Sequence, residues 1–309
     1  MRDVDVARRD FRAMGTTCSV LVYAPAGQAD ALAGLGRVRV ELLEGAWSRF
    51  RDDSELSRLN SRAGTGPVIV SSDTHALVSA MRAAWEATDG AFDPTVLAAM
   101  RAQGYDRDFA EVIVEHCFDV VASPTPGMHG IQIGENTVSL PPGVGLDPGA
   151  IGKGLASDIV VEELRGAGAH GVLVDLGGDL AFAGTPGADE NWRVGVVDER
   201  ARLGQAGGSD GDSWLDFPAG IDHAGVATST SLTRRWADAR HHVLDPTTGS
   251  STDERLVQAT VTGPRAWECE AWATAVLVRP ELARSIPEEM TCLALGGISP
   301  GVPDETKVA

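Results

Sequence analysis

The chain has 309 residues, of which 43% are hydrophobic, and this is enough apolar side chain to bury the core of one large domain or two ordinary ones. Asp and Glu number 44 against 26 Lys and Arg, so the formal net charge at pH 7 is −18. A protein this acidic repels polyphosphate backbones at long range, which argues against nucleic acid as a partner.

The spacing of the cysteines and the sequence of the N-terminus indicate the cellular compartment in which the protein is expected. Four cysteines lie far apart without C-x-x-C spacing, so neither a zinc cluster nor a thioredoxin-type pair is indicated. They are Cys18, Cys117, Cys269 and Cys292. Scattered cysteines fit a reducing compartment. Residues 1–11 lack the continuous apolar stretch of a secretory leader, and no apolar run is long enough to span a bilayer. We therefore expect a cytoplasmic protein with no membrane partner, although a processed chain would look the same.

The first half of the chain predicts one strand and two helices. Residues 18–23 are apolar and β-branched, which is typical of a strand. Residues 28–47 and 71–88 carry apolar side chains at helical spacing, and a serine or Asp73 is expected to cap the second of these helices.

The second half predicts more strands than helices. Residues 153–167 have helical periodicity, and an apolar strand at residues 171–176 follows and ends in a tight turn at two glycines. Further expected elements are strands at residues 192–197, 224–228 and 256–261, a buried helix at 265–278, and surface loops at 122–130 and 201–212. Because strands and helices do not alternate regularly, the pattern favours an α+β fold over a doubly wound sheet.

Six short motifs combine glycines, carboxylates and hydroxyls near the ends of predicted elements, where free backbone groups can hold a phosphate or a metal. Each motif is weak evidence alone. In chain order they are residues 13–17 (AMGTT), 48–60 (SRF, SELS and Asn60), 90–95 (GAFDPT), 146–154 (LDPGAIGKG), 176–179 (LGGD) and 242–249 (HVLDPTTG).

From about Met14 to the helix around Thr274, these motifs in this order resemble the ApbE family of FAD:protein FMN transferases. The resemblance implies an α+β fold with largely antiparallel, T-fold-like sheets packed with helices. It further implies one domain over residues 1–309, with an approximate core of 11–298. The implied activity is a Mg²⁺-dependent transfer of FMN from FAD to a threonine or serine of an acceptor flavoprotein, with release of AMP.

A metal site is expected on the last predicted helix. Glu270 and Thr274 are four residues apart, so the carboxylate and the hydroxyl project from one face, and such hard oxygen ligands suit magnesium. The resemblance adds a backbone carbonyl at Ala150. The family has an aspartate where this chain has Glu270, which bears on the geometry and the choice of ion. Taken alone, the E-x-x-x-T pattern is more often a surface glutamate beside a buried threonine.

Lys153 lies between two glycines at a helix start, where a cation, bare amides and the helix dipole can hold a pyrophosphate. The resemblance implies FAD contacts for Lys153 and for Asp147. The alternative is a solvated lysine at a helix start.

His242 is the histidine inside a dense motif, and an imidazole of near-neutral pKa can accept the proton of an attacking hydroxyl. The resemblance implies this role as well and places Val243 among the FAD contacts. We expect His241 to be structural or solvent-facing. Asp245 either orients its loop or the base, or serves only the turn.

The remaining expected FAD contacts precede residue 100. Phe50 stands where many relatives carry a tyrosine stacked on the isoalloxazine ring, and core packing explains a phenylalanine equally well. The resemblance assigns Met14, Ala91, Phe92 and Asp93 to the FAD pocket, although Gly90 and Pro94 also suit a plain loop after a helix.

Other motifs are less informative. Thr228 and Ser229 match a family Thr-Ser pair, but Thr230 replaces the glycine that usually follows. Residues 177–179 read as a turn that lets backbones approach closely.

Two rival functions stay open at this level. One is an FAD pyrophosphatase that uses the same site with water as the acceptor and yields FMN and AMP. The other is an inactive FAD-binding protein whose Glu270 holds the ion poorly.

Overall fold

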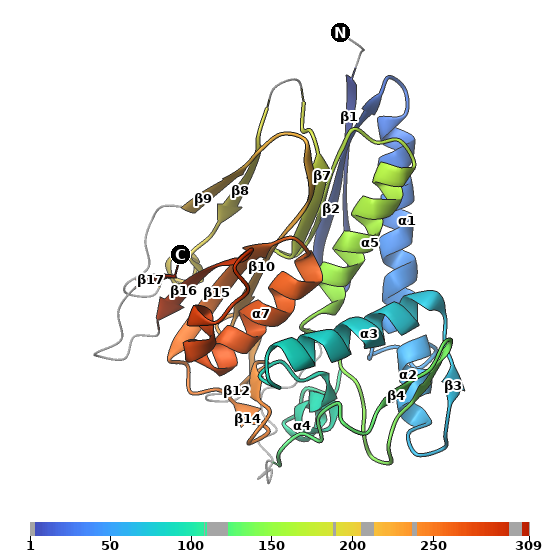
Figure 1. Cartoon of the computed structure of the whole chain (residues 1–309), viewed down its shortest axis with the longest axis vertical. Coiled ribbons are helices and arrows are strands. Elements are labelled where there is room, and N and C mark those ends of the chain that lie inside the picture. Colours follow the sequence, from blue (N-terminus) through green and yellow to red (C-terminus); the bar gives the residue numbers. More distant parts are fainter. Residues whose placement is uncertain are drawn as a thin grey trace.

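The structure is a computed structural model that describes residues 4–107, 109, 123–187, 190–204, 213–236, 240–296 and 305–308. Its centre is an eight-stranded sheet (Figure 1). The strand order is β1 (Val4–Ala13), β2 (Thr16–Pro25), β6 (Gly171–Leu176), β7 (Leu180–Gly184), β10 (Ile221–Thr230), β15 (Leu256–Gly263), β16 (Thr291–Gly296) and β17 (Glu305–Val308). Every neighbouring pair is antiparallel, so the fold is α+β as predicted.

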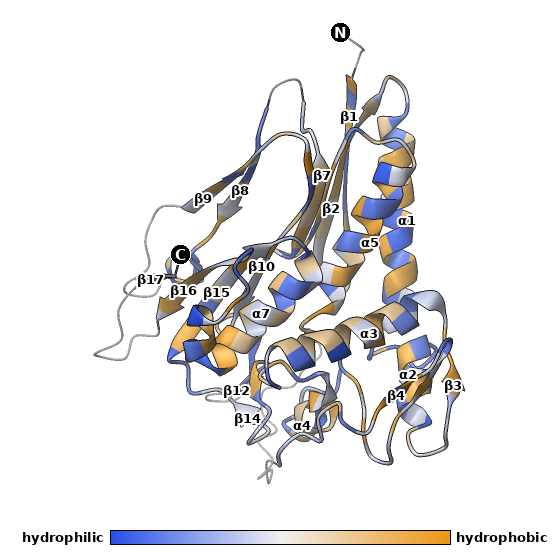
Figure 2. Ribbon diagram, viewed as in Figure 1, coloured by the Kyte–Doolittle hydropathy of each residue, from blue (hydrophilic) through white to orange (hydrophobic). Residues whose placement is uncertain are grey.

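Three helices cover one face of this sheet: α1 (Ala29–Trp47), α5 (Gly152–Gly166) and α7 (Ala266–Val278). The hairpin of β8 (Trp192–Val196) and β9 (Ser213–Phe217) packs on the other face through Trp192 and Val194. Blue and orange alternate along α1 and α5 in Figure 2, because each helix turns an apolar stripe to the sheet. The outer face of α1 also exposes three apolar side chains, Leu35, Val38 and Leu42.

Shorter elements close the lower end of the molecule in Figure 1. They are α2 (Glu55–Ser61), α3 (Ser72–Ala87), α4 (Leu97–Ala102) and a small sheet of β3 (Val68–Ile69), β5 (Thr137–Ser139) and β4 (Gln132–Ile133). Two short hairpins follow β10: β11 (Arg235–Trp236) with β12 (Arg240–His241), and β13 (Leu244–Asp245) with β14 (Ser250–Ser251).

The predicted elements are present, with ends shifted by at most a few residues. Ser71 caps α3 by accepting a hydrogen bond from the backbone N–H of Thr74 at 3.2 Å, so the serine rather than Asp73 begins that helix. The turn after β6 is made by Gly177 and Gly178, both with positive φ.

The loop prediction for residues 201–212 is wrong at its start. Residues 201 and 202 belong to the short helix α6 (Glu199–Arg202), which Asp198 caps. Residues 205–212 lie outside the described residues, as do residue 122 of the other predicted loop and Cys117. The described cysteines, Cys18, Cys269 and Cys292, are buried free thiols.

Four strands of the sheet were not predicted, namely β1, β7, β16 and β17. The strand β1 is rich in charged residues and exposes Val4 and Val6, so its sequence lacks the clear alternation of apolar and polar residues that predicts a strand. Such charges are common on strands at the edge of a sheet. The strand β7 directly follows the glycine turn, and its residues were assigned to no element. No helix within the described residues has the length and apolar character needed to cross a membrane.

The helix α7 is apolar on nearly all sides and is the most deeply buried of the three sheet-covering helices. Its start is wedged between two glycines: a Cβ on Gly154 of α5 would lie 2.5 Å from the Ala266 carbonyl oxygen, and one on Gly225 of β10 would lie 2.3 Å from the Ala266 nitrogen. The buried Asp158 carboxylate accepts both the Ala266 and the Trp267 N–H at 3.0 Å. This junction fixes the depth at which α7 presents its side chains.

Substituting Gly225→Ala should therefore destabilise the fold by about 1–3 kcal/mol or more, because the methyl group meets rigid backbone. The matched control is Gly34→Ala on α1, where a Cβ meets nothing within 4 Å and the replacement should stabilise by about 0.5–1 kcal/mol. Urea unfolding of both variants measures the two effects. Equal stability of the two variants would contradict a backbone-limited junction.

Candidate active site

One cavity of about 1110 Å³ opens where the sheet, the helix starts and the lower elements meet. Its wall includes the β1–β2 turn, the end of α1, the loops before α4 and α5, the β6–β7 turn, part of β8, and the start of β13. Its volume suits a large cofactor. All residues singled out from the sequence for a site line this cavity: Met14, Phe50, Ala91, Phe92, Asp93, Asp147, Ala150, Lys153, His242, Val243, Glu270 and Thr274.

Lys153 lies between two buried carboxylates. Its Nζ is 2.5 Å from Asp179 Oδ2 and also pairs with Glu270 Oε1. Burial alone lowers the pKa of Lys153, but the charges of Asp179 and Glu270 outweigh that effect and raise the pKa above its ordinary value. The ammonium is therefore firmly charged, and it joins α5, the β6–β7 turn and α7 at one point.

Glu270 and Thr274 point into the cavity from α7. Glu270 is 1% exposed, and its second oxygen accepts the Gly154 N–H at 2.7 Å. Burial raises the pKa of Glu270 despite the neighbouring Lys153. Thr274 Oγ1 lies 2.9 Å from Ser229 Oγ. The surface-glutamate interpretation of this pair is thus wrong.

These groups suit a hard cation. A carboxylate, a hydroxyl and the backbone of Ala150 border the same cavity, and oxygen donors of this kind hold magnesium. Within the described residues no cluster of three or more His, Cys, Asp or Glu could bind a metal on its own. A magnesium ion there would take further ligands from water or a bound phosphate, as this ion commonly does.

Asp147 is committed to protein partners. Its Oδ2 lies 3.0 Å from Nε of Arg49, both side chains being buried, and its Oδ1 accepts the Gly149 N–H at 2.8 Å. The Asp147 backbone N–H donates to the Pro94 carbonyl at 2.8 Å, which joins the loop before α5 to the loop before α4. This carboxylate therefore holds the cavity wall together in the structure.

Phe50 borders the cavity with 39% of its surface exposed, so core packing does not account for it. The Arg49 guanidinium lies 4.2 Å from the centre of its ring and 4.5 Å from that of Tyr105. Arg49 thus ties the exposed phenyl ring to the buried Asp147 and Tyr105, and it keeps that ring at the cavity wall.

The remaining expected contacts are held by their local turns. Met14, with φ 51°, and Gly15, with φ 69°, form the two-residue turn between β1 and β2, and the Met14 N–H donates to Glu44 at 2.6 Å. Ala91 and Phe92 are buried, and the Asp93 carboxylate accepts from Thr95 N–H at 2.8 Å and from the hydroxyl of Thr125.

His242 is half-buried at the cavity wall, and its Nδ1 has no hydrogen-bond partner among the described residues. Its backbone N–H donates to the Arg234 carbonyl at 3.3 Å. Burial first, and then the charges of Arg234, His241 and Lys153, lower the pKa of His242 to about 3. The imidazole is therefore neutral at physiological pH.

The neighbours of His242 are structural. His241 is wholly buried, and its Nδ1 accepts the Val243 N–H at 3.3 Å, which agrees with the first of the two roles expected for it. Asp245 accepts the Thr247 N–H at 2.8 Å within its own turn, so the plain turn role is the observed one.

Sequence reasoning missed several charged residues of the cavity. Asp179 was read as part of a turn, yet it pairs with Lys153. Arg49 and Arg234 were given no role, although both line the cavity. Arg49 stood inside a recognised motif, whereas no local pattern marks Arg234.

The fold and the cavity define an α+β protein in which an antiparallel sheet, covered by helices, carries a large cavity with polar and charged walls beside the start of α5. The chain belongs to the ApbE family, whose family profile matches residues 14–293.

Curated relatives and solved structures agree with this assignment. The chain is 30% identical over 296 residues to the FAD:protein FMN transferase of Treponema pallidum, covering 86% of this chain and 76% of that protein. It is 27% identical to that of Klebsiella pneumoniae, covering 91% and 81%. Two solved structures share the fold. The flavin transferase ApbE from Vibrio cholerae has a TM-score of 0.78 and 23% identity, and the match covers 99% of this chain and 98% of that one. The apo flavinyl transferase ApbE of Pseudomonas stutzeri has a TM-score of 0.80 and 20% identity, and the match covers 98% of this chain and 94% of that one.

The lowered pKa of His242 predicts a pH effect on stability. The unfolded histidine takes up a proton near its ordinary pKa of 6.5, while the folded one resists protonation until about 3. Its contribution to the free energy of unfolding is therefore fully present above 6.5 and is lost as the pH falls towards 3. Denaturant unfolding of the wild type and of His242→Gln at pH 7, 6, 5 and 4 should show the wild type losing stability relative to the variant on acidification. A difference between the two proteins that stays constant over this range would contradict the lowered pKa.

Proposed function

We propose that this chain transfers FMN from FAD to a threonine or serine hydroxyl of an acceptor flavoprotein and releases AMP. One observation carries the proposal: in a member of the ApbE family, residues from widely separated segments surround one cavity that brings a charged lysine, a carboxylate–hydroxyl pair and a neutral imidazole together. That combination suits the transfer of a phosphoryl-linked group.

FAD binding would divide between two parts of the cavity. The exposed ring of Phe50 offers a face for stacking the isoalloxazine, with Met14 and residues 91–93 beside it. Val243, 3% exposed, would contribute an apolar wall. Lys153 and the start of α5 would hold the diphosphate, since a cation and a helix N-terminus both favour negative charge. Asp147 would act by keeping this wall in place through Arg49.

Ala150, Glu270 and Thr274 would hold a magnesium ion, which when bound neutralises phosphate charge and polarises the diphosphate. Glu270 already pairs with a cation, the Lys153 ammonium, and Asp179 provides that ammonium with a second carboxylate when Glu270 turns to the ion.

His242 would act as the general base. Its imidazole is free of a proton at neutral pH. The negative diphosphate of bound FAD would offset the charges of Arg234 and Lys153 that lower this pKa, so that the imidazole can accept a proton from the acceptor hydroxyl. The hydroxyl oxygen then forms a bond to the phosphorus of the FMN moiety, and the anhydride bond to AMP breaks. AMP leaves with the bonding electron pair, and the acceptor keeps FMN as a phosphoester.

Incubating the protein with FAD, Mg²⁺ and a proven flavin-acceptor domain should give a fluorescent flavin band on a denaturing gel and one AMP per flavin attached. His242→Asn should lower the rate about 10²–10⁴-fold, because proton transfer to the base is lost. His129→Asn, at an exposed position outside the cavity, is the matched control.

Chromatography of the same reactions separates the rival functions. Free FMN and AMP without a labelled acceptor would show that the protein hydrolyses FAD and does not transfer FMN. FAD that binds tightly without any AMP release would make the protein a binding protein, and turnover restored by Glu270→Asp would then locate the defect at the metal site.

Removing the proposed metal ligands should raise the Mg²⁺ requirement. For Glu270→Gln and Thr274→Val we expect the half-saturating Mg²⁺ concentration of the FAD-bound protein to rise at least about tenfold. The matched control is Glu268→Gln on the same helix, which does not line the cavity. Calorimetric Mg²⁺ titration and thermal shift with FAD present measure the change. Unaltered Mg²⁺ binding in both ligand variants would place the ion elsewhere.

A further inference from the structure

Arg234 is a cation of the cavity that has no counter-ion in the part of the chain that the structure describes. Its side chain lines the cavity and is half-buried, yet no acceptor among the described residues lies within hydrogen-bond or ion-pair distance of its guanidinium. Two other cations of the cavity are paired, Arg49 with Asp147 and Lys153 with Asp179 and Glu270. Arg12 also borders the cavity, but its side chain is exposed to solvent. The adjacent Arg235 pairs with Glu254.

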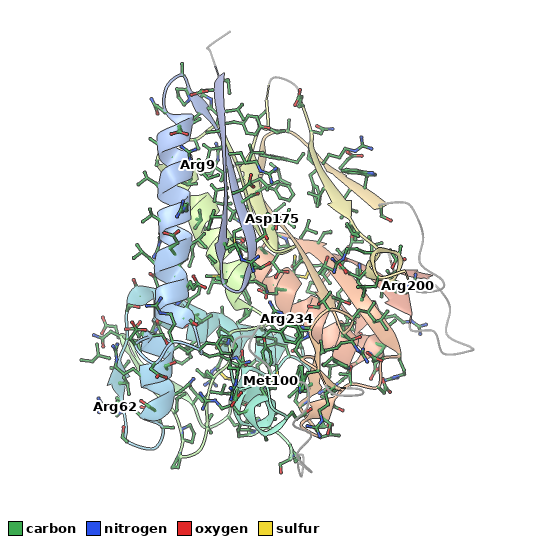
Figure 3. The ribbon with its side chains drawn as sticks, turned by 180° about the vertical axis from the view of Figure 1, so that it is seen from behind. Arg9, Arg62, Met100, Asp175, Arg200 and Arg234 are labelled. Atoms are coloured by element: carbon green, nitrogen blue, oxygen red, sulfur yellow. The ribbon has the colours of Figure 1, made fainter. Side chains whose placement is uncertain are left out.

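Arg234 influences the two groups expected to take part in the reaction, the imidazole of His242 and the ammonium of Lys153. Its carbonyl accepts the backbone N–H of His242 at 3.3 Å, and its positive charge contributes to the lowered pKa of that histidine. The same charge opposes protonation of Lys153. Figure 3 shows Arg234 near the centre of the molecule, in contrast to Arg62 at its lower left edge.

The segment that carries Arg234 is anchored on both sides. The Ser231 N–H donates to the Val257 carbonyl at 3.0 Å, and the Leu232 N–H donates to the Thr230 hydroxyl at 3.1 Å. After it, the buried Trp236 donates its indole N–H to the Gln103 carbonyl at 2.8 Å. The backbone that carries the guanidinium is therefore fixed before any ligand arrives, so only the side chain has to be ordered on binding.

An arginine that has no acidic partner among the described residues, and that stands beside a second cation and a neutral imidazole, costs electrostatic free energy in the free protein. The chain has 44 acidic residues and a net charge of −18, so the missing partner of Arg234 does not reflect a shortage of carboxylates. A ligand with at least two negative charges removes the repulsion between Arg234 and Lys153, and the diphosphate of FAD has that charge. The site is therefore complementary to the dinucleotide and not to the flavin alone.

We propose that Arg234 is a further catalytic residue, whose guanidinium contacts the diphosphate on the His242 side and stabilises the charge that develops at the attacked phosphorus. This rests on the proposed function. As the acceptor oxygen bonds to phosphorus and the anhydride oxygen departs with AMP, negative charge grows on the phosphoryl oxygens. The acceptor proton goes to His242, and Arg234 keeps its own protons throughout. The planar fork of arginine can contact two of these oxygens at once, which a lysine cannot do.

The test compares Arg234→Ala and Arg234→Lys with Arg62→Ala, which removes the same charge at an exposed position outside the cavity. Quenching of flavin fluorescence should show FAD binding to Arg234→Ala weakened about tenfold or more, with riboflavin binding unchanged because it has no phosphate. AMP release should fall about 10²–10³-fold, and millimolar guanidinium should restore part of it. Arg234→Lys should recover binding more fully than turnover.

Each outcome decides between a phosphate contact and a structural role. FAD affinity and turnover within twofold of the wild type in Arg234→Ala would overturn the proposal, as would equal losses for FAD and riboflavin. The proposed function can fail separately: a wild type that transfers no FMN to a proven acceptor refutes transfer, while the FAD-to-riboflavin comparison still decides whether Arg234 contacts the diphosphate.

Discussion

The cavity depends on one buried ion triad, in which Lys153 joins Asp179 and Glu270. Each member comes from a different element, namely the start of α5, the β6–β7 turn and the middle of α7. Burying these charges is costly, and removing Lys153 would leave two carboxylates without a cation in a poorly solvated place. The triad is therefore better understood as a device that fixes geometry than as a source of stability. It keeps the Lys153 ammonium protonated on the cavity floor, beside a carboxylate that can turn to a metal.

Backbone contact sets the distances within this triad. Gly154 and Gly225 let the start of α7 approach both α5 and β10 as closely as main chains allow, and Asp158 accepts the first N–H groups of the helix. Because Gly154 is adjacent to Lys153 and also donates to Glu270, the same close approach positions both charges. The contact of the α7 start with α5 and β10 therefore sets both the packing of this helix and the position of its site residues. A shift of α7 along or away from the sheet would move Glu270 and Thr274 together.

Local sequence patterns were sufficient for elements whose period is strong and insufficient for pairings across the chain. The spacing of apolar residues in α1, the serine cap of α3 and the glycine turn after β6 are local, and each was predicted. The edge strand β1 was not, because half of its surface faces water and its charges mask the alternation. The site residues were found through family motifs. Asp179 and Arg234 were missed because no local pattern marks them: Asp179 pairs with Lys153 of another element, and Arg234 is notable only because no acid among the described residues pairs with it.

The glutamate at position 270, where the family pattern has aspartate, has a structural reason in this triad. Its carboxylate spans from α7 to the Gly154 N–H and to the Lys153 ammonium, so both oxygens are used. An aspartate is shorter by one methylene, and α5 cannot move nearer to meet it because Gly154 already borders the Ala266 backbone. At this helix spacing the longer side chain satisfies both donors. If a metal ion took the place of Lys153 beside Glu270, the Gly154 N–H would still hold one oxygen of the carboxylate. The ion would then lie on the side of the cavity that Thr274 and Ala150 also border.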